Sequence, residues 1–160
     1  MQSALFIGRF QPLHNGHLQV IKDILKKNDH LIIVIGSAQN PKDQRNPYTA
    51  GERFEMIDQT LKAAKIPKEK YDIIPIPDLN DPPNYATYIT KLIPTYNHLY
   101  TGSPLVEECF RVPFPNLKIT KLSRDKIPVS STEIREKISK KQDWQNLVPK
   151  SVAAYITSKL

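Results

Sequence analysis

The feature that most restricts the fold of this chain is an apolar run, a glycine-containing turn and a helical pattern in immediate succession. Residues 4–7 (ALFI) predict a buried β-strand. Apolar residues recur at helical spacing between positions 18 and 25. The segment between them, residues 8–17, reads GRFQPLHNGH. In a parallel α/β sheet such a turn lies at the carboxyl edge, where ligands bind and where the next helix points its free N–H groups.

The same alternation of strand and helix patterns continues along the chain. It predicts an α/β fold with a single Rossmann-like parallel sheet, helices on both faces and residues 1–160 in one domain. Two prolines in the run 71–77 place that strand near a sheet edge. The further predicted strands are 31–35, 71–77, 98–101 and 117–120, and the further helices are 49–64 (capped by Thr49), 84–93, a short one after 104, 132–140 and 144–160.

Composition describes an ordinary globular chain of 160 residues, of which 39% are hydrophobic and 24% charged. No apolar run approaches the length of a membrane span, and the N-terminus enters a strand directly, so we expect neither a membrane segment nor a signal peptide. The single cysteine, Cys109, fits a reducing compartment, and we expect it to be buried. These features predict a cytoplasmic protein.

The formal net charge of +7 raises the question of an anionic partner. Lysines are scattered along the chain, and no basic stripe alternates with aromatic residues as in many nucleic-acid-binding surfaces. A positive field that attracts small anions accounts for the charge equally well. We therefore expect no nucleic-acid partner.

The turn at residues 8–17 carries groups suited to a polyphosphate. His14, His17 and Arg9 gather there next to a helix N-terminus. Gly8 is expected to let the chain turn off the strand, and Gly16 to permit a close backbone approach or a positive φ. The segment lacks the Gly-Lys-Ser/Thr of a P-loop.

A second candidate anion site stands near the other end of the chain. Ser130, Ser131 and Thr132 precede a predicted helix, which Ser131 is expected to cap. Arg135 lies one turn into that helix and could grip the same anion with its planar fork. An ordinary capped helix with a solvated arginine fits these residues too, and for this segment alone that interpretation is preferred.

Together the two segments resemble a known family. His-x-Gly-His near the N-terminus with Ser-Ser-Thr-x-x-Arg near the C-terminus is similar to the pattern of the nucleotidyltransferase superfamily of adenylyltransferases and cytidylyltransferases. Residues 36–39, 45–53, 74–78 and 100–106 further resemble the archaeal-type nicotinamide mononucleotide adenylyltransferases. The resemblance extends from residue 5 to about residue 156 and weakens after residue 110.

This resemblance implies an enzyme that joins ATP and nicotinamide mononucleotide to give NAD and pyrophosphate, with Mg²⁺ held mainly by ATP phosphates and water and by no protein ligand. Tyr85 stands where the family commonly carries tryptophan. By position, the resemblance assigns His14, His17 and Arg135 to catalysis, Arg9, Phe10, Gln11, Gly16, Arg45, Ser130, Ser131 and Thr132 to ATP, and Ser37, Asp78 and Tyr85 to the mononucleotide.

Three alternatives stay open at this point. Another adenylyltransferase, such as phosphopantetheine adenylyltransferase, shares both motifs but fits residues 36–39 and 49–53 poorly. A non-catalytic nucleotide sensor would need only the phosphate cradle, and a nucleic-acid-binding domain is supported by charge alone. Members of the resembled family often assemble, so a homo-oligomer is compatible with the chain.

Overall fold

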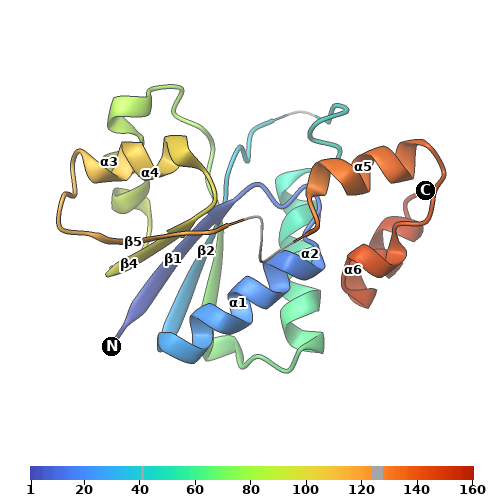
Figure 1. Cartoon of the computed structure of the whole chain (residues 1–160), viewed down its shortest axis with the longest axis horizontal. Helices are drawn as coiled ribbons and strands as arrows, with labels where there is room; N and C mark the ends of the chain where they lie inside the picture. Colours follow the sequence, from blue (N-terminus) through green and yellow to red (C-terminus); the bar gives the residue numbers. More distant parts are fainter. Residues whose placement is uncertain (41, 124–127) are drawn as a thin grey trace.

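The computed structural model describes residues 1–40, 42–123 and 128–160 (Figure 1). These residues form a five-stranded sheet whose neighbouring strands are all parallel, in the order β3-β2-β1-β4-β5. The α/β class with one Rossmann-like parallel sheet is therefore confirmed. The strands are β1 (Ser3–Gly8), β2 (His30–Ile35), β3 (Tyr71–Pro75), β4 (His98–Thr101) and β5 (Lys118–Lys121).

Helices cover both faces of the sheet, as the alternating pattern predicted (Figure 1). Side chains alternate along β1: Phe6 packs in the core beneath α1, α2, α5 and α6, and Leu5 packs in the core beneath α3 and α4. The α-helices of the described part of the chain are α1 (Asn15–Lys27), α2 (Ala50–Ala63), α3 (Pro82–Leu92), α4 (Pro104–Arg111), α5 (Ser131–Ser139) and α6 (Lys150–Thr157).

The central strands β1 and β2 are nearly continuous apolar runs because both of their faces are covered. The proline-containing strand β3 lies at one edge, as predicted. Thr49 caps α2 through the predicted capping box, accepting from the Glu52 N–H while the Glu52 side chain accepts from the Thr49 N–H.

Three predicted boundaries are wrong in an informative way. The helix after β1 begins at Asn15, so His17 lies in its first turn rather than before it. Ser130, not Ser131, caps α5 by accepting from the Glu133 N–H. The pattern over 144–160 is not one helix: a 3-10 turn at Gln145–Leu147 precedes Pro149, and α6 follows.

The sheet order positions a ligand site. The chain builds β1, β2 and β3 outward to one side and then returns to place β4 on the other side of β1. In open α/β sheets the crevice at such a switch in direction, outside the carboxyl ends of the strands, is where ligands bind. Among the helices of the described residues, none has the length and apolar character needed to cross a bilayer.

Candidate active site

Two adjoining pockets open at the carboxyl ends of the strands around the β1–β4 switch point. The first, which we call the histidine pocket, has a volume of about 530 Å³ and is lined by both histidines of the turn. The second, the Asp78 pocket, has a volume of about 400 Å³ and is lined by the ends of β2 and β3 and by α3 and α4. The two pockets share four lining residues: Ile7, Gly8, Arg9 and Ser103.

The histidine pair is locked into the start of α1. His14 is the N-cap, and its Nδ1 accepts from the His17 N–H at 3.3 Å. In return, Nδ1 of His17 accepts from the His14 N–H at 3.2 Å. The two rings stack with their centroids 3.6 Å apart. Since Nδ1 is the acceptor in both rings, each neutral imidazole carries its proton on Nε2, which is then the remaining donor.

Burial keeps both imidazoles neutral. It lowers the pKa of His14 from its ordinary 6.5 to about 4. It also lowers the pKa of His17 well below 6.5, and the neighbouring His14 adds to that shift. At neutral pH the pair therefore offers N–H donors without carrying a net charge.

Phe10 and Gly8 explain the shape of the turn. Phe10 has a left-handed backbone (φ 54°), and its ring is 1% exposed within the core, where it meets the edge of the His17 ring. A Cβ at Gly8 would lie 2.9 Å from Cζ of that ring, so the glycine is needed for this close approach. Phe10, assigned to ATP by resemblance, lines neither pocket and supports the histidines from behind. Gly16 also lines neither pocket, and it has no positive φ.

Helix α5 docks directly on the N-terminal turn. The Ser131 hydroxyl donates to the Pro12 carbonyl at 2.9 Å, and the Ser130 hydroxyl caps the helix. Nη1 of Arg135 donates to the Gln11 carbonyl at 2.8 Å, and Nη2 donates to the Thr132 hydroxyl at 3.3 Å. The two ends of the chain thus build one wall of the histidine pocket.

The histidine pocket is cationic. Arg9, Arg45 and Arg135 line it from three separate segments, and no aspartate or glutamate of the described residues does so. Burial lowers the pKa of the Arg135 guanidinium, and the charge of Arg9 lowers it further. Such crowding of cations favours a bound anion. The predicted residues that line this pocket are Arg9, Gln11, His14, His17, Arg45, Ser130, Ser131, Thr132 and Arg135.

The Asp78 pocket has the opposite character. Ser37, held in the left-handed region (φ 51°), donates its hydroxyl to Oδ2 of Asp78 at 2.7 Å. Tyr85 lines the pocket from the first turn of α3 and packs edge-on against Phe110. Burial, followed by the charge of Asp78, raises the pKa of the Tyr85 phenol to about 12, so this ring stays neutral. The three residues predicted for the mononucleotide, Ser37, Asp78 and Tyr85, all line this pocket.

Two further side chains contribute to the Asp78 pocket. Asp81 adds a second carboxylate to its lining. Cys109 is buried, as expected from the sequence, and lies on α4 in the same wall. Burial raises the pKa of its thiol, which keeps it protonated at neutral pH.

Arg53 was missed by the sequence analysis, although it ends the Thr-Ala-Gly-Glu-Arg segment that carried part of the resemblance. Its side chain is 1% exposed. Its Nη1 donates to the carbonyls of Arg9 and Gly36, each at 2.8 Å, and its Nη2 to the carbonyl of Ser37 at 3.1 Å. Arg53 therefore joins the chain just beyond β1 to the chain just beyond β2. An arginine one turn into a capped helix behind the sheet edge was the only available signal.

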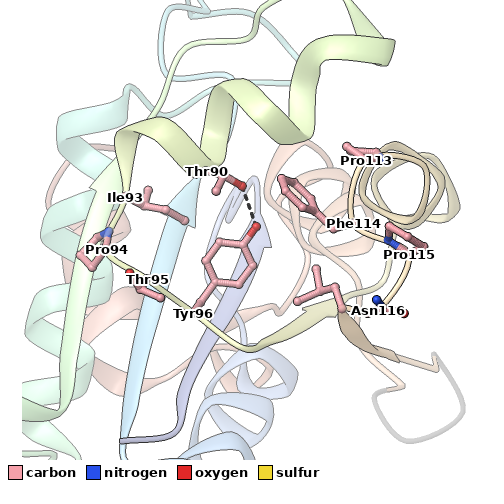
Figure 2. A pocket seen from close by; sticks show the side chains of 10 residues that line it. Thr90, Ile93, Pro94, Thr95, Tyr96, Pro113, Phe114, Pro115 and Asn116 are labelled. Carbon is pink, nitrogen blue, oxygen red and sulfur yellow. Dashed lines mark hydrogen bonds between the residues drawn. The ribbon is translucent and has the colours of Figure 1, made fainter.

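A third cavity lies away from all predicted site residues. It has a volume of about 460 Å³ and is lined by the segments that lead into β4 and β5, so it lies at the amino ends of these strands. Figure 2 shows Tyr96 within it, with its hydroxyl hydrogen-bonded to that of Thr90. Prolines 94, 113 and 115 line the cavity, and no charged residue does so among those described. We call it the proline pocket.

A parallel sheet with a paired-histidine helix N-terminus and a second, arginine-bearing helix end defines the class of nucleotidyltransferases. The chain belongs to the cytidylyltransferase-like family, which matches residues 5–137. Within that family it stands among relatives named nicotinamide-nucleotide adenylyltransferase. The protein of that name from Thermococcus kodakarensis is 38% identical over 98% of this chain and 82% of its own length. The one from Methanococcus aeolicus is 42% identical over 93% and 84%.

Solved structures agree on the fold. A bifunctional NMN adenylyltransferase/ADP ribose pyrophosphatase from Francisella tularensis superposes with a TM-score of 0.79 at 23% identity, covering 99% of this chain. The chain spans about half of that protein, 48% of its length. A complex of a protein of the same description with AMP and a manganese ion gives a TM-score of 0.72 at 25% identity, over 92% of this chain and 44% of that one.

Proposed function

We propose that this chain is a nicotinamide-nucleotide adenylyltransferase, which joins ATP and nicotinamide mononucleotide to give NAD and pyrophosphate. The observation that carries the proposal is the pair of adjoining pockets with opposite electrostatic character, which share the edge at Ile7, Gly8, Arg9 and Ser103. A reaction between two nucleotides needs two such sites with a common border. The names of the relatives support the choice of substrates.

The transfer requires no nucleophile from the protein. A 5′-phosphate oxygen of the mononucleotide attacks the α-phosphorus of ATP and forms a new P–O bond. The bond from that phosphorus to the oxygen bridging to the β-phosphate breaks, and pyrophosphate leaves with the electron pair. The attacking phosphate is already ionised at neutral pH, so no general base is needed. Catalysis then consists of positioning and charge neutralisation.

The residues of the histidine pocket fit the leaving group. Each histidine has Nε2–H as its remaining donor, because Nδ1 is occupied by the backbone. We assign these N–H groups, with Arg9, Arg45 and Arg135, to the triphosphate, where charge moves onto the departing pyrophosphate. The hydroxyl groups of Ser130, Ser131 and Thr132 complete the wall of the pocket.

Mg²⁺ enters this proposal as part of the nucleotide substrate. Among the described residues no group of three or more histidine, cysteine, aspartate or glutamate side chains is arranged to hold a metal ion. The histidine pocket offers cations and neutral donors but no described carboxylate. Such a lining suits a metal bound by phosphate oxygens and water. The manganese ion and AMP in a related structure support the use of a divalent cation.

The Asp78 pocket fits the mononucleotide. The nicotinamide ring of the mononucleotide is a flat cation. It can stack on Tyr85, which stands in place of the tryptophan common in the family. Asp78 and Asp81 supply negative charge near it. We also propose that the protein is cytoplasmic, and a homo-oligomer stays a prediction.

A substrate panel tests the proposal directly. The protein is incubated with Mg-ATP and, in turn, nicotinamide mononucleotide, nicotinate mononucleotide or phosphopantetheine, and pyrophosphate is measured. We expect release with nicotinamide mononucleotide together with an equal amount of NAD. Pyrophosphate release with phosphopantetheine and with neither mononucleotide would identify a different adenylyltransferase. ATP binding with no pyrophosphate from any acceptor would identify a sensor.

A further inference from the structure

The side chain of Gln11 is docked on the backbone of a distant segment. It is 2% exposed, although Gln11 is one of the residues that line the histidine pocket. Its Nε2 donates to the Tyr48 carbonyl at 2.8 Å, and its Oε1 accepts from the Tyr48 N–H at 3.0 Å. One carboxamide thus pairs with both polar groups of one residue, as a neighbouring β-strand would. It uses its acceptor and one of its two N–H donors in doing so.

The main chain of the same residue meets the other end of the protein. The Gln11 carbonyl accepts from Nη1 of Arg135 at 2.8 Å. Gln11 is therefore the point where three segments meet: the N-terminal turn, the segment before α2 and the start of α5. Each of these segments carries an arginine that lines the histidine pocket: Arg9 on the N-terminal turn itself, and Arg45 and Arg135 on the two segments that dock on it.

Arg45 sits on a compact turn whose position depends on the Tyr48 pairing. Oδ1 of Asp43 accepts from the N–H groups of Arg45 and Asn46, at 2.8 and 2.7 Å. The turn therefore moves as a unit. Tyr48, three residues beyond Arg45, ties the turn to the histidine pocket through this pair of hydrogen bonds, and its half-buried ring also packs against the core. The nearby Lys42–Glu52 ion pair involves an exposed lysine and contributes little.

We propose that Gln11 is a positioning residue that holds Arg45 and Arg135 in register with the histidine pair. The proposal rests on the proposed function in taking the ATP triphosphate as the anion these groups receive. A carboxamide suits the position because it supplies a donor and an acceptor without charge. A carboxylate would lack the donor and would place negative charge beside the triphosphate, and Asn is one methylene shorter.

A double-mutant cycle tests the positioning role. In the wild-type background, Arg45→Ala should weaken equilibrium binding of Mg-ATP by about tenfold, the order expected for losing one charged contact. Gln11→Met, which keeps the length but removes both hydrogen bonds, should weaken it about as much. In the double variant the effects should not add: Arg45→Ala should cost less than about twofold once Gln11 is Met. The KM for the mononucleotide should not change in either variant.

Gln19→Met is the matched control, since Gln19 is an exposed glutamine on α1 whose side chain donates to Asp23 on the same helix. It should leave Mg-ATP binding at the wild-type value. Additive effects of Gln11→Met and Arg45→Ala would overturn the proposal, as would wild-type ATP affinity in Gln11→Met.

Amide hydrogen exchange on the full chain gives a readout that needs no activity. Gln11→Met should release the Tyr48 N–H and speed exchange across residues 43–49, while β1 and β2 keep their protection. Gln11→Asn is measured in parallel. If the Gln11→Met protein folds poorly, exchange in Gln11→Asn still tests the role of the side chain. Unchanged exchange at 43–49 in a folded variant would contradict the positioning role of Gln11. If the substrate panel instead shows no adenylyl transfer, faster exchange would still support the positioning role of Gln11. Only the identity of the anion bound in the histidine pocket would need revision.

Discussion

The histidine pocket and the Asp78 pocket share a border but differ in charge and in construction. The histidine pocket gathers three arginines and two neutral histidines, with no acidic residue among the described lining. The Asp78 pocket has two carboxylates, Asp78 and Asp81, and one cation, Arg9, which the two pockets share. In our proposal, this difference in charge places the triphosphate in the histidine pocket and the cationic ring of the mononucleotide in the Asp78 pocket. Arg9, at the border, is placed to serve both phosphates at the point of transfer.

The two pockets are also held together in different ways. The histidine pocket joins segments more than 100 residues apart, through hydrogen bonds from Ser131 to Pro12 and from Arg135 to Gln11. The Asp78 pocket is built from neighbouring strand ends, where Ser37 and Gln39 after β2 bond Asp78 after β3. Damage to the first should therefore affect ATP, and damage to the second should affect the mononucleotide.

The largest expected effect comes from removing a histidine while keeping its cap. His17→Gln retains a side-chain acceptor at the third helical position, but its amide N–H no longer lies where the imidazole Nε2–H did. We expect kcat to fall by about 10²-fold or more, as for other donors that act on the leaving group. His17→Ala should lose the cap as well and become about 1 kcal/mol less stable. Full activity of a folded His17→Gln protein would remove the histidine from the mechanism.

Acid should destabilise the protein through the histidine pocket. The pKa of His14 in the native state is lowered to about 4. Between pH 7 and 5 this histidine therefore becomes protonated in the unfolded chain but stays neutral in the native state. Stability is full above the unfolded pKa of about 6.5 and should fall by about 2 kcal/mol by pH 5. Denaturant titrations at both pH values measure the loss. His14→Asn, which can still cap α1, should lose markedly less, and an equal loss would place the titrating group elsewhere.

Tyr85→Ala should affect the other substrate. Loss of a stacked ring costs roughly 1–3 kcal/mol, so KM for the mononucleotide should rise about 5- to 150-fold while KM for ATP stays constant. Because Tyr85 packs on Phe110, the melting temperature should also drop. Tyr85→Phe keeps the ring face and should retain both Michaelis constants. Tyr85→Trp should match or improve mononucleotide binding. An unchanged mononucleotide KM in Tyr85→Ala would make this ring a core residue only.

Arg135→Lys should have the smallest effect of the series. Lysine keeps the charge but cannot hold the Gln11 carbonyl and the Thr132 hydroxyl with one planar group. We expect KM for ATP to rise severalfold, by about 3- to 10-fold for one misplaced charged contact. The mononucleotide constant should not move. Identical kinetics for the two proteins would show that the planar fork is dispensable.

The sequence predicted the parts of the fold and site that depend on local pattern. Strand runs, the Thr49 capping box and the histidine spacing are set by residues within a few positions of one another. The Ser130 cap was missed by one residue, since either of two adjacent hydroxyls can cap a helix and the local sequence does not distinguish them. Phe10 was assigned to ATP by the family resemblance, and its left-handed backbone and core position had no local signal in the sequence.

Contacts between distant segments could not be predicted from spacing at all. The buried Arg53 fork and the pairing of Gln11 with Tyr48 involve carbonyl and N–H groups, which every residue has. Only the folded sheet brings those groups together, so residue types alone do not reveal them. These two side chains hold the borders of the pockets, and the sequence showed what the pockets contain better than what keeps them in place.

Hydrogen exchange with each substrate alone tests the division between the two pockets most directly. Mg-ATP by itself should slow exchange in residues 9–17, 43–49 and 129–135, which build the histidine pocket. Nicotinamide mononucleotide by itself should slow exchange in residues 76–85 and 103–109, around the Asp78 pocket. Apart from the residues that both pockets share, Ile7, Gly8, Arg9 and Ser103, protection of the Asp78 segments by ATP, or of the same segments by both ligands, would contradict the assignment.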